Sequence, residues 1–250
     1  MFNKTLRVID VQRIDNAPLA HLFLETLSLD FKPGQFVMLR PCQWEYDPFW
    51  PRPFSICTQD EHNMHIFLQI VGRGTQKLAY LQPGDEVDCW GPLGNGFEFA
   101  VDEDLLVLAG GMGLAPFIAL SRKHPNPQKI RLVFGHRLDL DCYPWHLIPA
   151  EVEKVALQQE TQTALKDFEK RLQEEIFSHS GKVFACGPRP FLQVVYKYAR
   201  QAKADAYISL ENKMACGIGA CLGCVTKTKQ GYKQTCVHGP VFSVHDLEDF

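Results

Sequence analysis

Near residue 101 the sequence changes its hydrophobic pattern, and this change limits the folds that the chain can adopt. Before that point, short segments rich in β-branched and aromatic residues are separated by turn formers such as KPGQ and QPGD. These segments are residues 5–14, 19–27, 35–42, 53–59, 64–72 and 85–92. Short strands at this spacing predict a small antiparallel barrel or sandwich.

Beyond residue 101, continuous apolar runs alternate with helical patterns. The runs that are typical of buried parallel strands are residues 104–111, 129–137 and 181–190. The expected helices are residues 115–124, 161–178 and 191–204. In the second of these, apolar residues at positions 165, 168, 172 and 176 form one stripe. Strands alternating with helices predict a parallel α/β sheet.

The chain is therefore expected to be an α+β multidomain protein. The first domain, residues 1–100, is the antiparallel β-barrel, and the second, residues 101–208, is the parallel α/β unit. The remaining residues, 209–250, are too few and too rich in cysteine to form a core unaided.

Composition and charge exclude several classes of protein. The net charge of −3 gives no overall field for nucleic acid or anionic lipid. The N-terminal residues alternate between charged and apolar types, so they contain no signal-peptide core. The longest uncharged run, residues 105–120, is shorter than a membrane span and is interrupted by glycines and Pro116. A cytoplasmic location is expected.

Nine cysteines in a chain without an export signal favour metal binding or redox chemistry over a disulfide framework. Cys42, Cys57, Cys89 and Cys142 are scattered, and we expect them to be inert thiols that are buried or partly buried.

Four other cysteines form a cluster with the spacing C-x4-C-x2-C-x11-C, in the stretches ACGIGACLGC and QTCVHG. This spacing is typical of the ligands of a plant-type 2Fe–2S cluster. A loop that wraps such a cluster must pass close to it, and the interleaved glycines Gly217, Gly219 and Gly223 permit the unusual dihedrals required. Structural zinc is the main alternative, but zinc sites more often use two C-x2-C pairs with few glycines.

The second motif is RPFS at residues 52–55, followed by VGRGT at residues 71–75. The arginine can pair with a pyrophosphate, and the serine hydroxyl can reach a flavin nitrogen. The backbone of Gly74 and Thr75 can approach a phosphate at the start of the expected helix 75–81. Together the two segments predict a flavin nucleotide lying across the barrel.

The third motif is AGGMGLAP at residues 109–116, where a strand passes into a helix. It differs from the G-x-G-x-x-G fingerprint, so the dinucleotide interpretation applies only in part, and a glycine turn needed only for packing is the alternative. The segment ACGP, which includes Cys186, adds a second glycine-bearing loop at the carboxyl end of the same sheet. Ligands of open α/β folds bind at this edge.

In this order, RPFS, GRGT, GPLGNGF, AGGMGLAP and ACGP resemble the motifs of the ferredoxin–NADP reductase superfamily, which combines a flavin-binding barrel with a nicotinamide-binding domain. The tail SLENKMACGIGACLGC narrows the resemblance to the electron transfer subunits of NAD-linked dihydroorotate dehydrogenase. The resemblance then spans essentially the whole chain.

The resemblance implies a role for each matching position. FAD would be held by Arg52, Pro53, Phe54, Ser55, Phe67, Leu68, Gln69, Gly74 and Thr75. The nicotinamide dinucleotide site would be shaped by Gly110, Gly111, Gly113, Pro116 and Gly187, with Cys186 as the catalytic residue beside the nicotinamide. The 2Fe–2S cluster would be ligated by Cys216, Cys221, Cys224 and Cys236.

Two parts of the sequence do not follow the family pattern fully. Pro51 stands where relatives commonly carry a first arginine, so Trp50 beside it could pack against the flavin or a partner. After residue 135, His136 and Arg137 could meet a 2′-phosphate, whereas two nearby aspartates would repel one, and NAD is favoured over NADP.

The resemblance also implies an FMN-containing catalytic subunit as partner, in a heterotetramer with two copies of each, that oxidises dihydroorotate in pyrimidine biosynthesis. Electrons would pass from FMN through the cluster and FAD to NAD. The alternatives are a reductase subunit for another partner, such as a sulfite reductase or hydrogenase, and a zinc-bearing interaction module. Between Lys213 and Lys227 the chain carries no charge, which predicts either an interface around the cluster or a shield for it within one chain.

Overall fold

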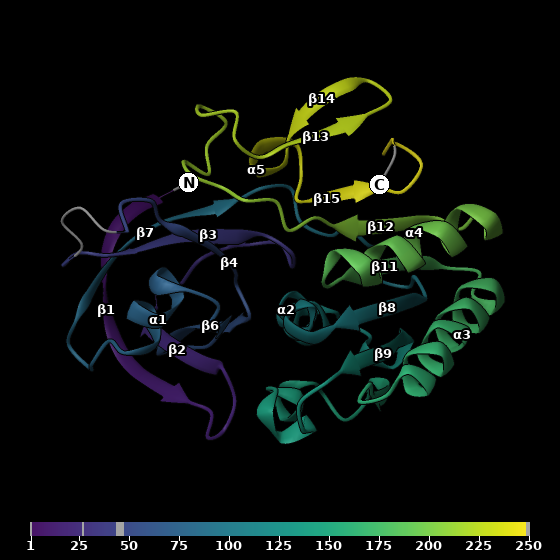
Figure 1. The fold of residues 1–250 in the computed structure, drawn as a ribbon, viewed down its shortest axis with the longest axis horizontal. Helices are drawn as coiled ribbons and strands as arrows, with labels where there is room; N and C mark the ends of the chain where they lie inside the picture. The colour runs from purple at the N-terminus through teal and green to yellow at the C-terminus, as the bar shows by residue number, and fades with distance from the viewer. Residues whose placement is uncertain (1, 27, 44–47, 249–250) are drawn as a thin grey trace.

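The computed structural model describes residues 2–26, 28–43 and 48–248. The first part of the chain forms a seven-stranded antiparallel sheet with the order β4-β3-β7-β1-β2-β6-β5. Its strands are β1 (Phe2–Arg13), β2 (Leu19–Glu25), β3 (Phe36–Pro41), β4 (Arg52–Ser55), β5 (Thr58–Gln59), β6 (Asn63–Gln69) and β7 (Glu86–Leu93). The sheet curls into a barrel at the left of Figure 1, with helix α1 (Arg73–Ala79) packed against it.

Alternating burial produces the barrel core. Leu6 and Val8 of β1 face inward together with Leu22 and Leu24 of β2, while Arg7 between Leu6 and Val8 faces solvent. Strand β7 likewise buries every second side chain, β2, β3 and β6 are buried along most of their length, and α1 closes the core with Leu78. The segment predicted as one strand at 53–59 forms two, β4 and β5, and Leu27 at the end of another prediction lies outside the described residues.

The second part forms a six-stranded sheet with the order β10-β9-β8-β11-β12-β15. Its strands are β8 (Leu105–Gly110), β9 (Ile130–His136), β10 (Glu153–Gln158), β11 (Lys182–Cys186), β12 (Ala206–Ser209) and β15 (Val241–Ser243). All neighbours are parallel except β15, which runs antiparallel to β12.

Helices cover both faces of this sheet. Helix α2 (Ala115–Lys123) lies between the sheet and the barrel, whereas α3 (Gln162–Ser178) and α4 (Arg189–Ala202) cover the outer face (Figure 1). In α3, the predicted stripe packs against the sheet through Phe168, Leu172 and Ile176. The pairing of an antiparallel barrel with a parallel α/β sheet confirms the predicted fold class.

Three strands of this sheet, β10, β12 and β15, escaped prediction. The sequence EKVALQ of β10 is nowhere fully buried, so it lacks the continuous apolar run that marks a central parallel strand. The four residues of β12 and the three of β15 are too few to show a pattern. Helix α1 begins at Arg73, two residues before the predicted start at Thr75, and Gly72 is its N-cap residue.

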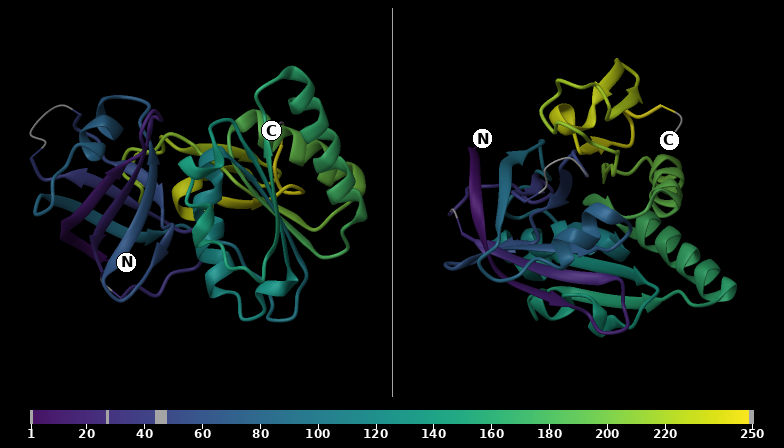
Figure 2. Two further views of the ribbon diagram at one scale, coloured as in Figure 1. Left: turned by 90° about the horizontal axis from the view of Figure 1, so that it is seen from below. Right: turned by 60° about the vertical axis from the view of Figure 1, so that its left-hand side comes forward.

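The C-terminal segment lies against both sheets (Figure 2). It contains the hairpin of β13 (Val225–Thr228) and β14 (Gly231–Gln234), the short helix α5 (Thr235–His238) and β15. Its buried contacts with the barrel are made by Cys224 and Cys236, which pack on Phe36, Met38 and Leu93. None of the helices in the described ranges has both the length and the apolar character needed to cross a membrane.

Candidate functional site

A cavity of about 700 Å³ lies between the barrel and residues 209–214. We call it the barrel cavity. Of the residues predicted to hold FAD, those that line it are Arg52, Pro53, Phe54, Ser55, Phe67, Leu68, Gln69 and Thr75. Strand β4 presents the first four of these, β6 presents Phe67, Leu68 and Gln69, and α1 presents Thr75, so segments separated in the sequence meet at this cavity. Trp50, which is 51% exposed, also lines the cavity, so its indole remains accessible there.

Arg52 lies directly over the N-terminal turn of α1. A Cβ atom added to Gly74 would come within 2.8 Å of the Arg52 Nε atom, so any other residue here would force the guanidinium to shift. Arg52 Nη1 donates to the carbonyl oxygen of Trp50 at 2.6 Å. Gly74 therefore contributes to the site by packing beneath Arg52, and it does not itself line the cavity. A cation fixed over a helix N-terminus suits a pyrophosphate.

The hydroxyl of Thr75 makes its hydrogen bonds within the loop that precedes α1. Its hydroxyl oxygen accepts from the backbone N–H of Val71 at 2.9 Å and of Gly72 at 3.2 Å, and the hydroxyl donates to the Gly72 carbonyl oxygen. The side chain thus fixes the turn that carries Arg73 and Gly74. Thr75 shapes the phosphate-facing loop through these bonds.

A second cavity of about 560 Å³ opens at the carboxyl ends of β8, β9 and β11. We call it the sheet cavity. Gly110 and Gly111 line it, together with Pro188 and Phe191 at the start of α4. Gly111 has φ +52° and nothing within 4 Å of the place where a Cβ would stand, so this backbone is open to a ligand. The predicted residues Gly113, Pro116 and Gly187 line neither cavity.

Gly113 serves packing. A Cβ atom there would overlap the carbonyl group of Cys186, so the 3-10 turn Gly111–Leu114 can press against the end of β11 only with glycine at this position. The packing alternative considered for this loop thus describes Gly113, while Gly111 remains available to a dinucleotide.

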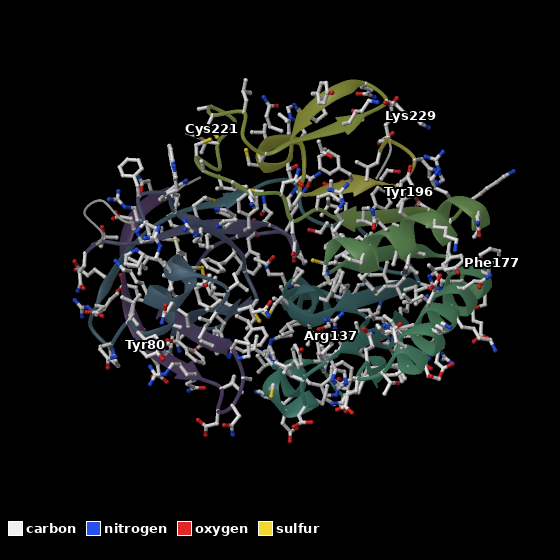
Figure 3. All side chains as sticks on the ribbon, viewed as in Figure 1. Tyr80, Arg137, Phe177, Tyr196, Cys221 and Lys229 are labelled. Carbon is white, nitrogen blue, oxygen red and sulfur yellow. The ribbon has the colours of Figure 1, made fainter. Side chains whose placement is uncertain are left out.

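Only some of the residues at the end of β9 and just after it line the sheet cavity. His136 and Arg137 line it, and Arg137 is exposed near the middle of the lower half of Figure 3. His136 is buried, and its Nδ1 lies 2.7 Å from the carbonyl oxygen of Leu138, within the same turn. Asp139 and Asp141 are exposed and line neither cavity.

Gln69, Met112 and Glu211 line both cavities, so the barrel cavity and the sheet cavity adjoin at these residues. Glu211 was not singled out from the sequence. Its side chain is open to the cavities but protein surrounds it on most sides, and this desolvation raises its pKa to about 7. A lone acidic residue following an apolar segment at the carboxyl edge of the sheet was the only available indication of it.

Cys186 ends β11 and lines the barrel cavity beside this junction. Burial and the nearby carboxylate of Glu211 raise the pKa of Cys186 far above its usual value. This direction favours the neutral thiol at physiological pH. The Cys186 sulfur can make a small, polarizable contact with a ligand.

The four clustered cysteines lie close together, and one of them, Cys221, is labelled near the top of Figure 3. Cys224 and Cys236 are buried, whereas Cys216 is partly exposed and Cys221 is exposed. Their side chains contact each other in two pairs, Cys216 with Cys221 and Cys224 with Cys236. Two pairs are the arrangement that two irons require, since each iron takes two thiolates.

Backbone N–H groups point at these sulfurs. Ile218 N and Cys221 N each donate to Cys216 Sγ at 3.4 Å, and Gly219 N donates to Cys236 Sγ at 3.2 Å. Burial opposes ionisation of Cys216, but the N–H groups outweigh it and lower its pKa to about 7. Amide dipoles of this kind stabilise thiolates.

The loop depends on its glycines. Gly217 has φ +74° and Gly219 has φ +82°, dihedrals that other residues adopt only with strain. Within residues 2–26, 28–43 and 48–248, no three His, Cys, Asp or Glu side chains gather around a point that would hold a single metal ion. The paired thiols fit a two-iron cluster, in which each iron takes two thiolates.

The scattered cysteines differ from expectation at one position. Cys57 and Cys89 are buried and Cys142 is partly buried, as predicted. Cys42 is exposed instead, because it follows β3 at the rim of the barrel, where its Sγ lies 3.4 Å from Asp88 Oδ1.

Comparisons with known proteins agree with this geometry. Residues 211–248 match the family model described as the iron-sulfur cluster binding domain of dihydroorotate dehydrogenase B. The chain is 36% identical over 219 residues to the dihydroorotate dehydrogenase B (NAD(+)) electron transfer subunit of Caldanaerobacter subterraneus subsp. tengcongensis, covering 86% of both chains. The corresponding subunit of Clostridium acetobutylicum is 33% identical, with 88% of this chain and 87% of the relative covered.

Solved structures show the same fold. An NADH-dependent reduced ferredoxin-NADP oxidoreductase, studied for flavin-based electron bifurcation, superimposes with a TM-score of 0.81 at 20% identity, covering 97% of this chain and 89% of that chain. The ferredoxin-NADP+ reductase of Plasmodium falciparum gives a TM-score of 0.67 at 14% identity, with 84% and 96% covered. At these identities the likeness concerns the fold.

Proposed function

The chain belongs to the family of electron transfer subunits of NAD-linked dihydroorotate dehydrogenase B, and from this premise we propose how its parts divide the work. Residues 209–250 carry a 2Fe–2S cluster, residues 1–100 carry FAD and residues 101–208 bind NAD. Electrons delivered by a catalytic partner subunit pass through cluster and flavin to NAD+.

The observation that supports this order most directly is the adjacency of the three sites. Met214 and Pro240, which flank the cysteine cluster in sequence, line the barrel cavity. The barrel cavity in turn shares Gln69, Met112 and Glu211 with the sheet cavity. The cysteine segment thus adjoins the barrel cavity, and the barrel cavity adjoins the sheet cavity, which is the order that the proposed electron transfer requires.

When bound, the cluster supplies one-electron exchange, and the flavin links it to the two-electron hydride chemistry of nicotinamide. The protein's part is to bind and orient. Arg52 neutralises the pyrophosphate of FAD, Ser55 offers its hydroxyl to the flavin ring, and Gly74 lets the arginine lie close. Cys186 fills the junction as a neutral thiol. These roles extend the family's motifs to the matching positions of this chain.

Glu211 has a further role at the junction of the two cavities. With a pKa of about 7 it can hold a proton or release one near neutrality. Its Oε atoms are then suited to keep the junction electrically neutral when ligands exclude water from it.

The partner subunit carries the oxidation of dihydroorotate to orotate. We propose that it contains FMN and assembles with this chain as a heterotetramer of two copies of each. The cluster loop is the part of this chain that faces it.

Replacing Cys221 by Ser tests the order of the sites. The variant is expected to lose the absorbance of the iron–sulfur cluster and to keep FAD, since ligand and flavin lie on different segments. NADH oxidation with an artificial acceptor that takes electrons from flavin should continue. Dihydroorotate-dependent reduction of NAD+ by the complex with the catalytic subunit should be lost.

Cys42→Ser is the matched control, because Cys42 is also an exposed thiol but belongs to the barrel rim. It should keep both activities and the full spectrum. A Cys221→Ser complex that still reduces NAD+ at the wild-type rate would contradict the proposed order.

A further inference from the structure

The motif GPLGNGF at residues 91–97 lines neither cavity, yet it lies where the barrel meets the cysteine segment. It begins within β7, which pairs with β3, and β3 pairs with the flavin strand β4. The end of β7 is therefore in the same sheet as the predicted flavin ligands. Two side chains from this end, Trp90 and Asn95, reach across to the cysteine segment.

Trp90 holds the first cysteine of the cluster. Its indole Nε1–H donates to the carbonyl oxygen of Cys216 at 3.2 Å. The next residue, Gly217, lies so close to the barrel that an added Cβ would stand 2.6 Å from Met38 Cγ. The peptide between Cys216 and Gly217 thus rests directly on the barrel sheet, with the indole as its hydrogen-bond partner.

Asn95 holds the chain that follows the last cysteine. Its Nδ2 donates to the carbonyl oxygens of Val241 at 2.8 Å and His238 at 3.2 Å, and its Oδ1 accepts from Val241 N at 3.2 Å. The backbone N–H of Asn95 donates to the Gly239 carbonyl oxygen at 2.8 Å. One side chain therefore fixes both ends of the turn from His238 to Val241.

The two attachments lie on opposite ends of the ligand set, and the space between them is tightly packed. Phe36 lines the barrel cavity and also packs against Cys224 and Cys236. A shift of the cysteine segment on the barrel would change both the separation of cluster and flavin and the contacts of this ring. Groups just outside a metal's ligands orient those ligands and tune the metal.

We propose that Trp90 and Asn95 are positioning residues that fix the iron–sulfur site relative to the flavin site, an inference that rests on the proposed function. The effect is exerted through the backbone of Cys216 and through the turn after Cys236. Neither side chain needs to touch flavin or nicotinamide.

The test uses Trp90→Phe, which removes the indole N–H and keeps an aromatic ring, and separately Asn95→Ala. Rapid mixing of the FAD- and cluster-loaded chain with NADH follows flavin reduction and cluster reduction at separate wavelengths. Cluster reduction is expected to slow about 10-fold, the lower end of the losses seen when partners of metal ligands are removed. Flavin reduction should stay at the wild-type rate, and the electron paramagnetic resonance spectrum of the reduced cluster should change.

Each variant has a matched control in the nicotinamide domain. Trp145→Phe alters a tryptophan that stacks on Phe134, away from the cysteines. Asn126→Ala removes a side-chain amide that likewise bonds the backbone, at the carbonyl oxygen of Val101. Neither control should change cluster reduction or the resonance spectrum.

Three outcomes would overturn the proposal. One is an unchanged spectrum and cluster-reduction rate in both Trp90→Phe and Asn95→Ala. Another is an equal slowing of flavin reduction and cluster reduction, which marks general loosening rather than positioning. The third is a wild-type chain without a cluster signal, which removes the proposed function together with this inference.

Discussion

Glu211 has a pKa that makes it sensitive to pH changes around neutrality. Desolvation raises this pKa to about 7, above the value of 4.5 for an unperturbed glutamate. A carboxyl group with a raised pKa carries no penalty below its unfolded pKa, where it is protonated in both states. Above its folded pKa it must be charged in the native protein, so the native state loses stability as pH rises between the two values.

Glu211→Gln removes this penalty. The melting temperature of the variant should therefore exceed that of the wild type by a margin that grows as pH rises from about 5 to about 8. Thermal unfolding of the FAD-bound proteins across this range measures the margin. Glu61→Gln, in the exposed turn before β6, is the control and should give no such trend. A margin that shrinks toward alkaline pH would refute the assignment.

At the scale of elements, the contact between β4 and the first turn of α1 forms the proposed clamp on FAD. Arg52→Ala should weaken FAD binding by about 1.5–3 kcal/mol, the value of a charge-assisted contact shielded from water, or roughly ten- to a hundredfold in affinity. Flavin fluorescence during serial dilution measures the release. Arg7→Ala, on the exposed side of β1, should retain FAD as the wild type does.

Gly74→Ala tests the same clamp without removing the charge. An added Cβ would stand 2.8 Å from Arg52 Nε, so the guanidinium must move away from the helix. FAD should be released more readily although Arg52 is intact. Wild-type retention in both Arg52→Ala and Gly74→Ala would show that the clamp lies elsewhere.

Elements with a strong local pattern could be predicted from sequence. Strand β7 alternates buried residues with more exposed ones between turn formers, and β8 is a continuous apolar run, so both carry their structure locally. Strand β10 is an edge strand with only partly buried residues, and β12 has four residues, so tertiary pairing rather than pattern defines them.

The same distinction applies to the site. The cysteine spacing and the glycines of the loop are local properties, and they predicted the cluster. Glu211, by contrast, acquires its raised pKa from the walls of two cavities that meet only in the folded chain. Trp90 and Asn95 likewise act on residues more than a hundred positions away, and no local spacing indicates such contacts.

At the scale of the whole molecule, the cluster loop presents apolar side chains to the outside. Ile218 is 50% exposed, Leu222 59% and Val237 49%. Because these residues surround the ligands and are not covered by the rest of the chain, they shield the cluster incompletely, which favours an interface over an internal shield. The catalytic partner subunit of this family is the occupant that we expect there.

Ile218→Glu places an unpaired charge in this surface without altering a ligand. It should abolish co-purification with the catalytic subunit and leave the cluster spectrum, FAD content and NADH–acceptor activity unchanged. Val101→Glu adds the same charge to another exposed aliphatic residue, in the turn that connects β7 to β8, and should leave the complex intact. A stable complex that contains Ile218→Glu would move the interface to another face.

Strand β15 gives the cysteine segment a second effect on the molecule. It pairs with β12, and without it the backbone of β12 would form an open edge of the six-stranded sheet. Open edges recruit strands from other chains and lead to aggregation. Since Val241 follows Cys236 within the same short segment, we expect loss of the cluster to loosen the strand that covers this edge. Iron depletion and thiol oxidation are therefore expected to increase aggregation of the protein as well as to slow electron transfer.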